Sequence, residues 1–328
     1  MGSYLPERVV TNEEIAPRMD STPEWIVSHT GIVTRHVAAA SESASTMGVE
    51  AARTALANAG VAPEDVGMII LSTTMPDYGN YPSTACLVQG ALGCVNAAAF
   101  DLAAACSGFV YGLEMAKCYL LCHPERKAIV ICSEILSRQI DWADRSNAML
   151  FGDGAAAVVL AAEEGADANR SSAVLLGADG NGAPLIVREC GCGHPFSDDP
   201  VHAASETPSM PYLKMDGHAV FTFAVRKLDE VVRALCAKSS LAPESLDLVV
   251  AHQANRRILE SVARRMKLPM EKFYLNLTDV GNTSSASIPL CLDKAVREGV
   301  LKDGMRIVVV GFGSGLTWAG SLMQWPYL

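Results

Sequence analysis

The chain has 328 residues, of which 50% are hydrophobic and 19% charged, and its formal net charge at pH 7 is −10. This length suits two domains or one large α/β body with a sizeable core. The negative charge argues against a nucleic-acid partner, because phosphate binding requires a basic face.

The amino terminus and the cysteines indicate a cytoplasmic protein. The first residues, MGSYLPERVVTNEEI, lack the basic flank and apolar run of a signal peptide. No run along the chain approaches the roughly 20 apolar residues that cross a bilayer, so we expect no membrane partner. Most of the ten cysteines lie among apolar or small residues, as reduced core thiols do.

The second half of the chain repeats a pattern of the first. Residues 45–60 have the spacing of an amphipathic helix, and an Ala-Pro-Glu turn then leads into the apolar run 66–72. Residues 219–240 are again followed by an Ala-Pro-Glu turn and an apolar run. Aligning Pro63 with Pro243 pairs core positions of the two runs, which predicts one α/β unit used twice. Strands that are apolar throughout are buried on both faces.

The pattern then continues in both halves with a short run, a helix and a further strand. We predict an amino-terminal half over residues 1–165 and a carboxyl-terminal half over residues 166–328. Residues 166–210 are rich in Gly, Asp, Ser and Pro, which is typical of loops at a junction.

Polar residues at strand ends are the candidates for a site, because a duplicated α/β body brings the carboxyl ends of strands together. Cys106 ends a run in the first half, and Asn282 lies at nearly the equivalent place in the second. His252 follows the run 246–251. A lone cysteine or histidine is by default a core residue, and Asn282 could simply shape a turn. However, Cys106 precedes a predicted helix, whose free N–H groups and dipole should lower the thiol pKa.

Several motifs, taken in order, resemble those of the β-ketoacyl-acyl-carrier-protein synthase III family of the thiolase superfamily. They are DLAAACSGF (101–109), FGDGAAAVVL (151–160), YLKMDGHAVFTFAV (212–225), AHQANRRI (251–258), DVGNTSSASIP (279–289) and GFGSGLTWAG (311–320). The resemblance covers nearly the whole chain. It implies the duplicated thiolase fold, an α/β fold of five layers in the order α-β-α-β-α, and a homodimer.

The resemblance also implies a reaction. The enzyme would need no cofactor beyond its coenzyme A substrate, and it would condense a short primer acyl-CoA, such as acetyl-CoA, with malonyl-acyl-carrier protein to start fatty acid synthesis. Cys106 would carry the primer, and His252 and Asn282 would donate N–H groups to the enolate oxygen. The backbone N–H groups of Cys106 and Ser314 would form an oxyanion hole. Ser314 replaces the middle glycine of a triplet that is usual in the family.

The resemblance further assigns residues that contact the substrates. Those for coenzyme A are Trp25, Arg145 and Asn255, and those for the acidic carrier protein are Lys214, Arg256 and Arg257. His29 stands where the family commonly has arginine, so a permanent charge becomes one that is largely neutral at pH 7. Tyr81 would cap the acyl pocket of the partner subunit and leave room for a short primer, unless its ring swings aside and admits longer or branched chains.

Two other functions stay open. One is a relative that transfers the acyl group of Cys106 to an oxygen or nitrogen acceptor, or that serves specialised metabolism. The other is a non-catalytic dimer partner, a class that loses the nucleophile. The retained Cys106, His252 and Asn282 favour condensation.

Two further features lead to expectations of absence. Cys190, Cys192 and His194 lie too close together for usual zinc spacing, so we expect no metal site. Relatives normally have a short strand before the segment GSYLPERVVTN, so either the start codon is misplaced or an edge strand of the core is missing, and a protein that lacks this strand should be less stable.

Overall fold

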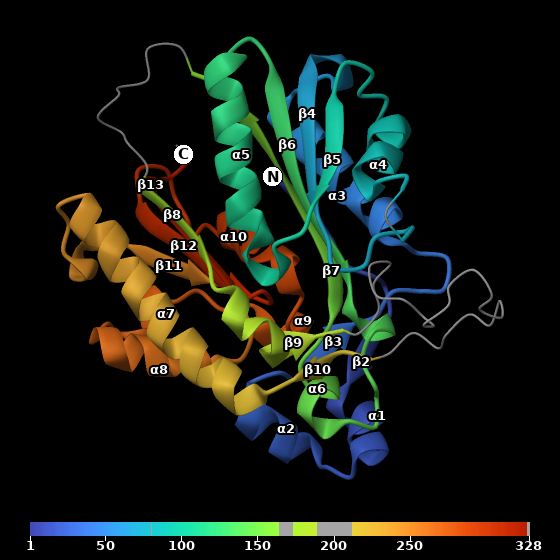
Figure 1. The fold of residues 1–328 in the computed structure, drawn as a ribbon, viewed down its shortest axis with the longest axis vertical. Coiled ribbons are helices and arrows are strands. Elements are labelled where there is room, and N and C mark those ends of the chain that lie inside the picture. Colours follow the sequence, from blue (N-terminus) through green and yellow to red (C-terminus); the bar gives the residue numbers. More distant parts are fainter. Residues whose placement is uncertain (80, 164–172, 189–211, 327–328) are drawn as a thin grey trace.

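The computed structural model describes residues 1–79, 81–163, 173–188 and 212–326, and it contains two large β-sheets flanked by helices (Figure 1). The first sheet has the strand order β1-β7-β6-β4-β5. Its strands are β1 (Gly2–Tyr4), β4 (Val66–Ser72), β5 (Ala98–Leu102), β6 (Lys127–Ile135) and β7 (Asp153–Ala161). β4 runs parallel to β5 and β6, whereas β7 is antiparallel to β6 and β1.

The second sheet has the order β11-β12-β13-β8. Its strands are β8 (Ala173–Ala178), β11 (Leu248–Ala251), β12 (Arg306–Gly313) and β13 (Thr317–Gln324). β11 is parallel to β12, and β13 is antiparallel to both of its neighbours. A parallel bridge between Val249 and Phe273 extends this sheet beyond β11. Phe273 thus lies beside β11 in the same way that β5 lies beside β4 in the first sheet. The two sheets therefore share one arrangement of strands.

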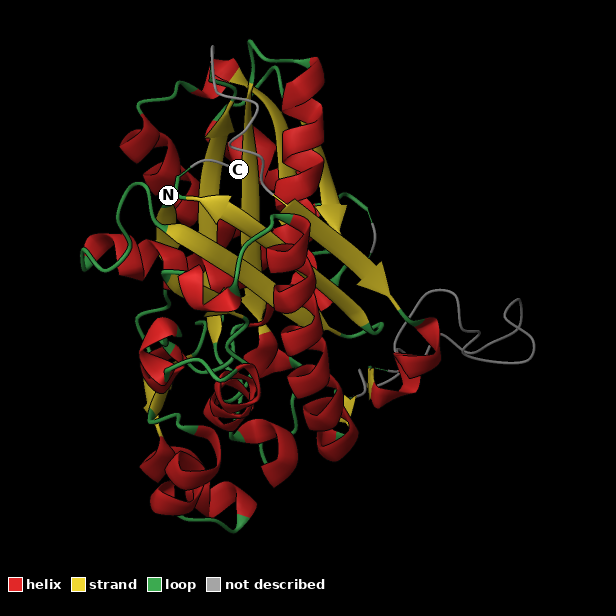
Figure 2. Ribbon diagram, turned by 90° about the vertical axis from the view of Figure 1, so that its left-hand side faces the viewer, coloured by secondary structure: helices red, strands yellow, loops and turns green. Residues whose placement is uncertain are grey.

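The helices form three layers around the sheets (Figures 1 and 2). α3 (Ala44–Ala59) and α4 (Thr84–Leu92) cover the outer face of the first sheet, and α7 (Gly217–Lys238) covers that of the second, with α8 (Arg256–Met266) packed beside it. α5 (Gly108–Cys122) and α10 (Ser287–Arg297) lie between the sheets. This arrangement confirms the predicted α/β fold of five layers.

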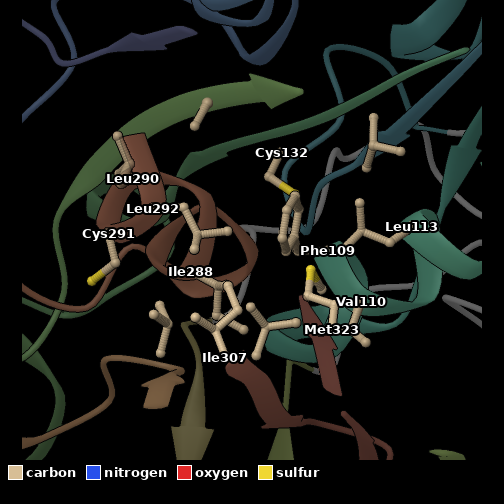
Figure 3. Packing of buried hydrophobic residues seen from close by; sticks show 14 of the residues in the cluster. Phe109, Val110, Leu113, Cys132, Ile288, Leu290, Cys291, Leu292, Ile307 and Met323 are labelled. Atoms are coloured by element: carbon tan, nitrogen blue, oxygen red, sulfur yellow. The ribbon is translucent and has the colours of Figure 1, made fainter. Parts of the chain in front are cut away.

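The central layer holds a large hydrophobic cluster (Figure 3). Phe109 of α5 and Ile288 of α10 are buried there against residues of both sheets, among them Val130 and Ile307. Fully burying a large apolar side chain stabilises the fold by about 1.5–3 kcal/mol. The central helices thus join the two sheets, and this packing fixes the positions of the strand ends of the two halves relative to each other.

The edge of the first sheet is present, so of the two alternatives a missing edge strand was wrong. β1 pairs with β7 through Gly2, Ser3 and Tyr4. A methyl group at Gly2 would lie 2.4 Å from the carbonyl oxygen of Ala51, so glycine lets the strand lie against α3. The Ser3 hydroxyl also donates a hydrogen bond of 2.6 Å to Asp293 of α10.

Short elements surround the carboxyl ends of the strands. They are β2 (Val9–Thr11), α1 (Asn12–Ile15), α2 (Pro23–Thr30), β3 (Thr34–His36), α6 (Arg145–Ala148), β9 (Ile186–Val187), β10 (Lys214–Met215) and α9 (Leu277–Val280). The turns Ala105–Ser107 and Ser284–Ala286 are single 3₁₀ turns at the starts of α5 and α10. Of the predicted junction loops, the described part includes the strand β8 as well as turns. None of the helices in the described residues has the length and apolar character needed to cross a membrane.

Candidate active site

A cavity of about 450 Å³ lies at the carboxyl ends of β11 and β12 and is lined from both halves of the chain. Cys106, His252 and Asn282 all line it. These three residues are far apart in the sequence, and the duplicated fold brings them to one place. Phe312 and Gly313, at the end of β12, complete this side of the cavity.

Cys106 lies in the single turn that joins β5 to α5. The preceding residue, Ala105, has a φ of +44°, a left-handed conformation that is strained for alanine. β12 passes directly beside this turn, because a methyl group at Gly313 would lie 2.7 Å from the Cys106 nitrogen. One at Gly311 would lie 3.1 Å from the Cys106 carbonyl oxygen. The glycines of β12 therefore allow the close approach of the two halves at this cysteine.

The expected lowering of the Cys106 pKa was wrong. Although the residue is partly accessible from the cavity, burial raises the pKa of its thiol to about 12. The Glu134 carboxyl acts in the same direction, whereas the Ser284 hydroxyl, 3.3 Å from Sγ, and the cysteine's own backbone N–H lower it. The cost of desolvating a thiolate outweighs the stabilisation expected from the free N–H groups at the start of the helix. The resting sulfur is therefore a protonated thiol near neutral pH.

His252 follows β11 and is 1% exposed. Its backbone N–H donates to Val310, and its ring packs edge-on against Phe312 with centroids 5.4 Å apart. Burial lowers the pKa of its imidazole to about 3, so the ring is neutral at physiological pH. A neutral imidazole carries one N–H donor and one acceptor nitrogen.

The neighbour of His252 governs which nitrogen carries the proton. Nδ1 lies 2.6 Å from the Ser287 hydroxyl oxygen, which also accepts the backbone N–H of Gln253. That hydroxyl has a single hydrogen, which goes either to Nδ1 or to the Ser284 carbonyl oxygen 2.8 Å away. In the first arrangement, Nε2 carries the proton and can serve as a donor.

Asn282 occupies the turn after α9, and the backbone holds it on both sides. Its N–H donates to Leu150, and its carbonyl accepts from Gly152. Gly281, with a φ of +69°, lies so close to Leu150 that a methyl group would reach 2.9 Å from that carbonyl oxygen. The Asn282 side-chain oxygen accepts the N–H of Ser284 at 2.9 Å. This bond leaves the side-chain NH₂ as the group available to a ligand.

Ser314 also lines the cavity, directly after β12. Its hydroxyl donates a hydrogen bond of 2.6 Å to the Ile186 carbonyl of β9. The serine side chain thus attaches the loop after β12 to β9.

The predicted coenzyme A contacts lie near one another. The guanidinium carbon of Arg145 is 4.7 Å from the centre of the Trp25 ring. His29 stacks on Trp25 at 3.9 Å, with the rings tilted by 19°. Asn255 lines the cavity and donates to the His29 carbonyl at 3.1 Å. An aromatic and cationic surface therefore leads toward the cavity.

The predicted docking cations are all exposed on the elements around this opening. Lys214 lies on β10, and Arg256 and Arg257 begin α8. Arg256 forms an exposed ion pair of 2.9 Å with Glu260 one turn later.

Tyr81 is 86% exposed and does not line the cavity of its own chain. Cys190, Cys192 and His194 lie outside the described residues. Within the described part, no group of three or more His, Cys, Asp or Glu side chains could hold a metal ion.

The sequence argument did not single out Ser284, Ser287 and Glu134 as parts of the site. The two serines lie in the same motif as Asn282, where only their small size draws notice. Glu134 ends a buried apolar strand, and a charged residue in that position is a signal that could have been used.

Comparison with known proteins gives matches along the chain. Residues 100–180 match the family model described as 3-oxoacyl-[acyl-carrier-protein] synthase III, and residues 236–325 match that of its carboxyl-terminal part. The chain is 42% identical over 325 residues to a beta-ketoacyl-[acyl-carrier-protein] synthase III of Caldanaerobacter subterraneus, covering 99% of this chain and 96% of that protein. It is 44% identical over 328 residues to that of Bordetella petrii, with 98% and 96% covered.

Solved structures resemble it throughout. The 3-oxoacyl-[acyl-carrier-protein] synthase III of Aquifex aeolicus superposes with a TM-score of 0.88 at 38% identity, covering 99% of this chain and 98% of that one. The priming beta-ketosynthase of the R1128 polyketide pathway gives a TM-score of 0.90 at 36% identity, with 99% and 95% covered.

Proposed function

Because the chain belongs to the 3-oxoacyl-[acyl-carrier-protein] synthase III family, we propose a mechanism in which Cys106, His252 and Asn282 carry out the reaction of that family. The protein is a condensing enzyme: it joins a primer acyl group from coenzyme A to malonyl-acyl-carrier protein and so starts fatty acid synthesis. The observation that carries the proposed roles is the convergence of the three side chains on one cavity.

The first step moves the primer onto Cys106. The sulfur attacks the thioester carbon, a new S–C bond forms, and the bond to the coenzyme A sulfur breaks. The thiol proton leaves Cys106, and the departing coenzyme A takes up a proton to become a free thiol. We assign the negative oxygen of the intermediate to the backbone N–H groups of Cys106 and Ser314, which the close approach at Gly313 supports.

The second step forms the carbon–carbon bond. The malonyl group loses carbon dioxide, and its electrons form an enolate on the thioester of the carrier protein. The Asn282 NH₂ and the His252 Nε2–H donate to the enolate oxygen. Since the imidazole is neutral, it stabilises this charge without protonating the carbon. That carbon then attacks the Cys106 thioester, the C–S bond breaks, and the sulfur leaves as a thiolate that takes up a proton from solvent to restore the thiol.

Substrate binding would use the surface around the opening. Trp25 and Arg145 stack with the nucleotide of coenzyme A, and Asn255 contacts its pantetheine arm. The acidic carrier protein docks on Lys214, Arg256 and Arg257, and no separate cofactor takes part. These assignments rest on the exposed cations and on the stacked arrangement of Trp25.

We further assign a cytoplasmic homodimer. β5 lies at the edge of the first sheet and leaves Phe100 39% exposed, and an exposed edge strand favours pairing with a second copy. Tyr81, 86% exposed, would then cap the partner's cavity and restrict the primer to acetyl or a similarly short group. The cysteines described in the structure are free, which agrees with a reducing compartment.

Intact mass spectrometry tests the mechanism. Wild-type enzyme and Cys106→Ala are incubated with a panel of acyl-CoAs, and malonyl-acyl-carrier protein is then added. We expect one short acyl mass on the wild type alone, discharged as a β-ketoacyl product. An adduct that malonyl-acyl-carrier protein fails to discharge would favour transfer to another acceptor, and adduct formation on Cys106→Ala would disprove the role of Cys106.

A further inference from the structure

Ser284 contacts Cys106 and Asn282 directly, and it is linked to His252 through Ser287. Its hydroxyl oxygen lies 3.3 Å from the Cys106 sulfur. Its backbone N–H donates to the side-chain oxygen of Asn282 at 2.9 Å, and its carbonyl oxygen lies 2.8 Å from the Ser287 hydroxyl oxygen, which also contacts Nδ1 of His252. The residue is 2% exposed, so water does not compete for these bonds.

The backbone of Ser284 is held in an unusual conformation. Its φ is +50°, in the left-handed region that serine rarely adopts. Such strain persists where surrounding contacts hold it, and it concentrates at functional sites. At Ser284 the bonds to Asn282, Ser287 and Cys106 supply those contacts. The turn therefore fixes the hydroxyl beside the sulfur rather than leaving it to rotate into solvent.

The acyl-transfer step creates a need for a donor at this place. When the S–H bond breaks, negative charge develops on the Cys106 sulfur. Burial and the Glu134 carboxyl both destabilise this charge. Glu134 already accepts hydrogen bonds from the side chains of Thr74 and Ser285, with Ser284 as a further and weaker partner. A hydroxyl directed at the sulfur can offset part of this cost.

We propose that Ser284 is a further catalytic residue, whose hydroxyl donates a hydrogen bond to the Cys106 sulfur as the thiolate forms, while its backbone N–H holds Asn282 in place. This inference rests on the proposed role of Cys106 as the acyl acceptor. The hydroxyl keeps its own hydrogen throughout: the thiol proton leaves with the departing coenzyme A. The charged and titratable groups around the sulfur and the cavity are Glu134 on β6, His252 after β11 and Arg188 after β9.

The test measures the reactivity of Cys106 in Ser284→Ala. Iodoacetamide is added at several values between pH 7 and 10, and labelling is followed on the Cys106 peptide by mass spectrometry, because Cys86, Cys118 and Cys122 are exposed and also react. Only the thiolate is alkylated, so loss of the donor should slow labelling about tenfold at every pH, as expected for one hydrogen bond to a charged group. Transfer of the acyl group from acyl-CoA should slow by a similar factor.

Matched variants separate this role from a structural one. Thr283→Val alters the neighbouring side chain, whose hydroxyl has no hydrogen-bond partner within the described part of the chain, and should label like wild type. Ser284→Gly removes the hydroxyl but tolerates the positive φ, so it replaces the alanine variant if that one does not fold.

Equal labelling and acylation rates in wild type, Ser284→Ala and Ser284→Gly would overturn the inference. That outcome is distinct from failure of the proposed function, in which the wild type itself would gain no acyl mass on Cys106.

Discussion

The Nδ1 atom of His252 lies 2.6 Å from the hydroxyl oxygen of Ser287, and both residues are buried. When this hydroxyl donates to Nδ1, the imidazole proton is placed on Nε2, where it can stabilise the enolate. Ser287→Ala removes that preference. We expect the condensation step to slow about tenfold to hundredfold, which is less than the 10²–10³-fold effect of removing an oxyanion donor because the imidazole remains and loses only its preferred tautomer, while transfer of the primer to Cys106 stays within about twofold of wild type.

Single-turnover measurements of the two half-reactions check this separation. Ser287→Thr retains the hydroxyl and serves as the conservative control. If Ser287→Ala slowed both half-reactions equally, the serine would be a general packing residue rather than the one that orients His252.

The buried His252 should also make stability depend on pH. Its pKa is about 3 in the folded protein and 6.5 as the ordinary value, so the unfolded chain binds a proton in this window that the folded chain does not. The stability from the neutral ring is complete above pH 6.5 and is lost as the pH falls, by up to about 1.4 kcal/mol per pH unit.

Burial raises the pKa of Glu134 and Asp153, and these carboxyls act in the opposite direction because the folded protein retains their protons as the pH rises. Comparison of wild type with His252→Asn cancels them. Urea unfolding from pH 4 to 6.5 should give a steeper rise of unfolding free energy with pH in the wild type than in the variant. Equal slopes would mean that the folded imidazole titrates normally.

The repeat and the strand ends could be predicted from sequence because they depend on hydrophobic pattern and topology. Aligning Pro63 with Pro243 found two strands that occupy equivalent places in the two sheets, and their ends identified His252. The pKa of Cys106 could not be predicted in this way. Position before a helix is visible in the sequence, whereas desolvation depends on what packs around the sulfur, including Glu134 and the glycines of β12.

The docking assignment predicts an effect that is confined to one substrate. Arg257→Glu should raise the KM for malonyl-acyl-carrier protein several-fold, because the new carboxylate repels an acidic partner. Such long-range electrostatic effects act mainly on the association rate. Acyl transfer from coenzyme A should be spared. Lys302→Glu is the control: that lysine is exposed near the start of β12, the end of the strand away from the site.

Steady-state kinetics at two salt concentrations distinguish the outcomes. The difference between wild type and Arg257→Glu should shrink as salt screens the charges. An equal loss in both half-reactions, or a similar rise in KM with Lys302→Glu, would argue against docking at α8.

The approach of β12 to the Cys106 turn predicts that Gly313→Ala disables the enzyme. The new methyl group would lie 2.7 Å from the Cys106 nitrogen and 3.1 Å from the Ala105 side chain. Real contacts of this kind are longer, so the backbone around Cys106 has to move, and its N–H leaves the position proposed for the oxyanion hole. Loss of one such donor slows catalysis about 10²–10³-fold. Gly90→Ala, in α4 on the outer face of the first sheet, where a methyl group would meet nothing within 4 Å, should behave like wild type. The initial rate of acyl-enzyme formation, measured by mass spectrometry on both variants, tests this prediction. Rapid acylation of Gly313→Ala would show that the position of the Cys106 N–H does not depend on the close approach of Gly313.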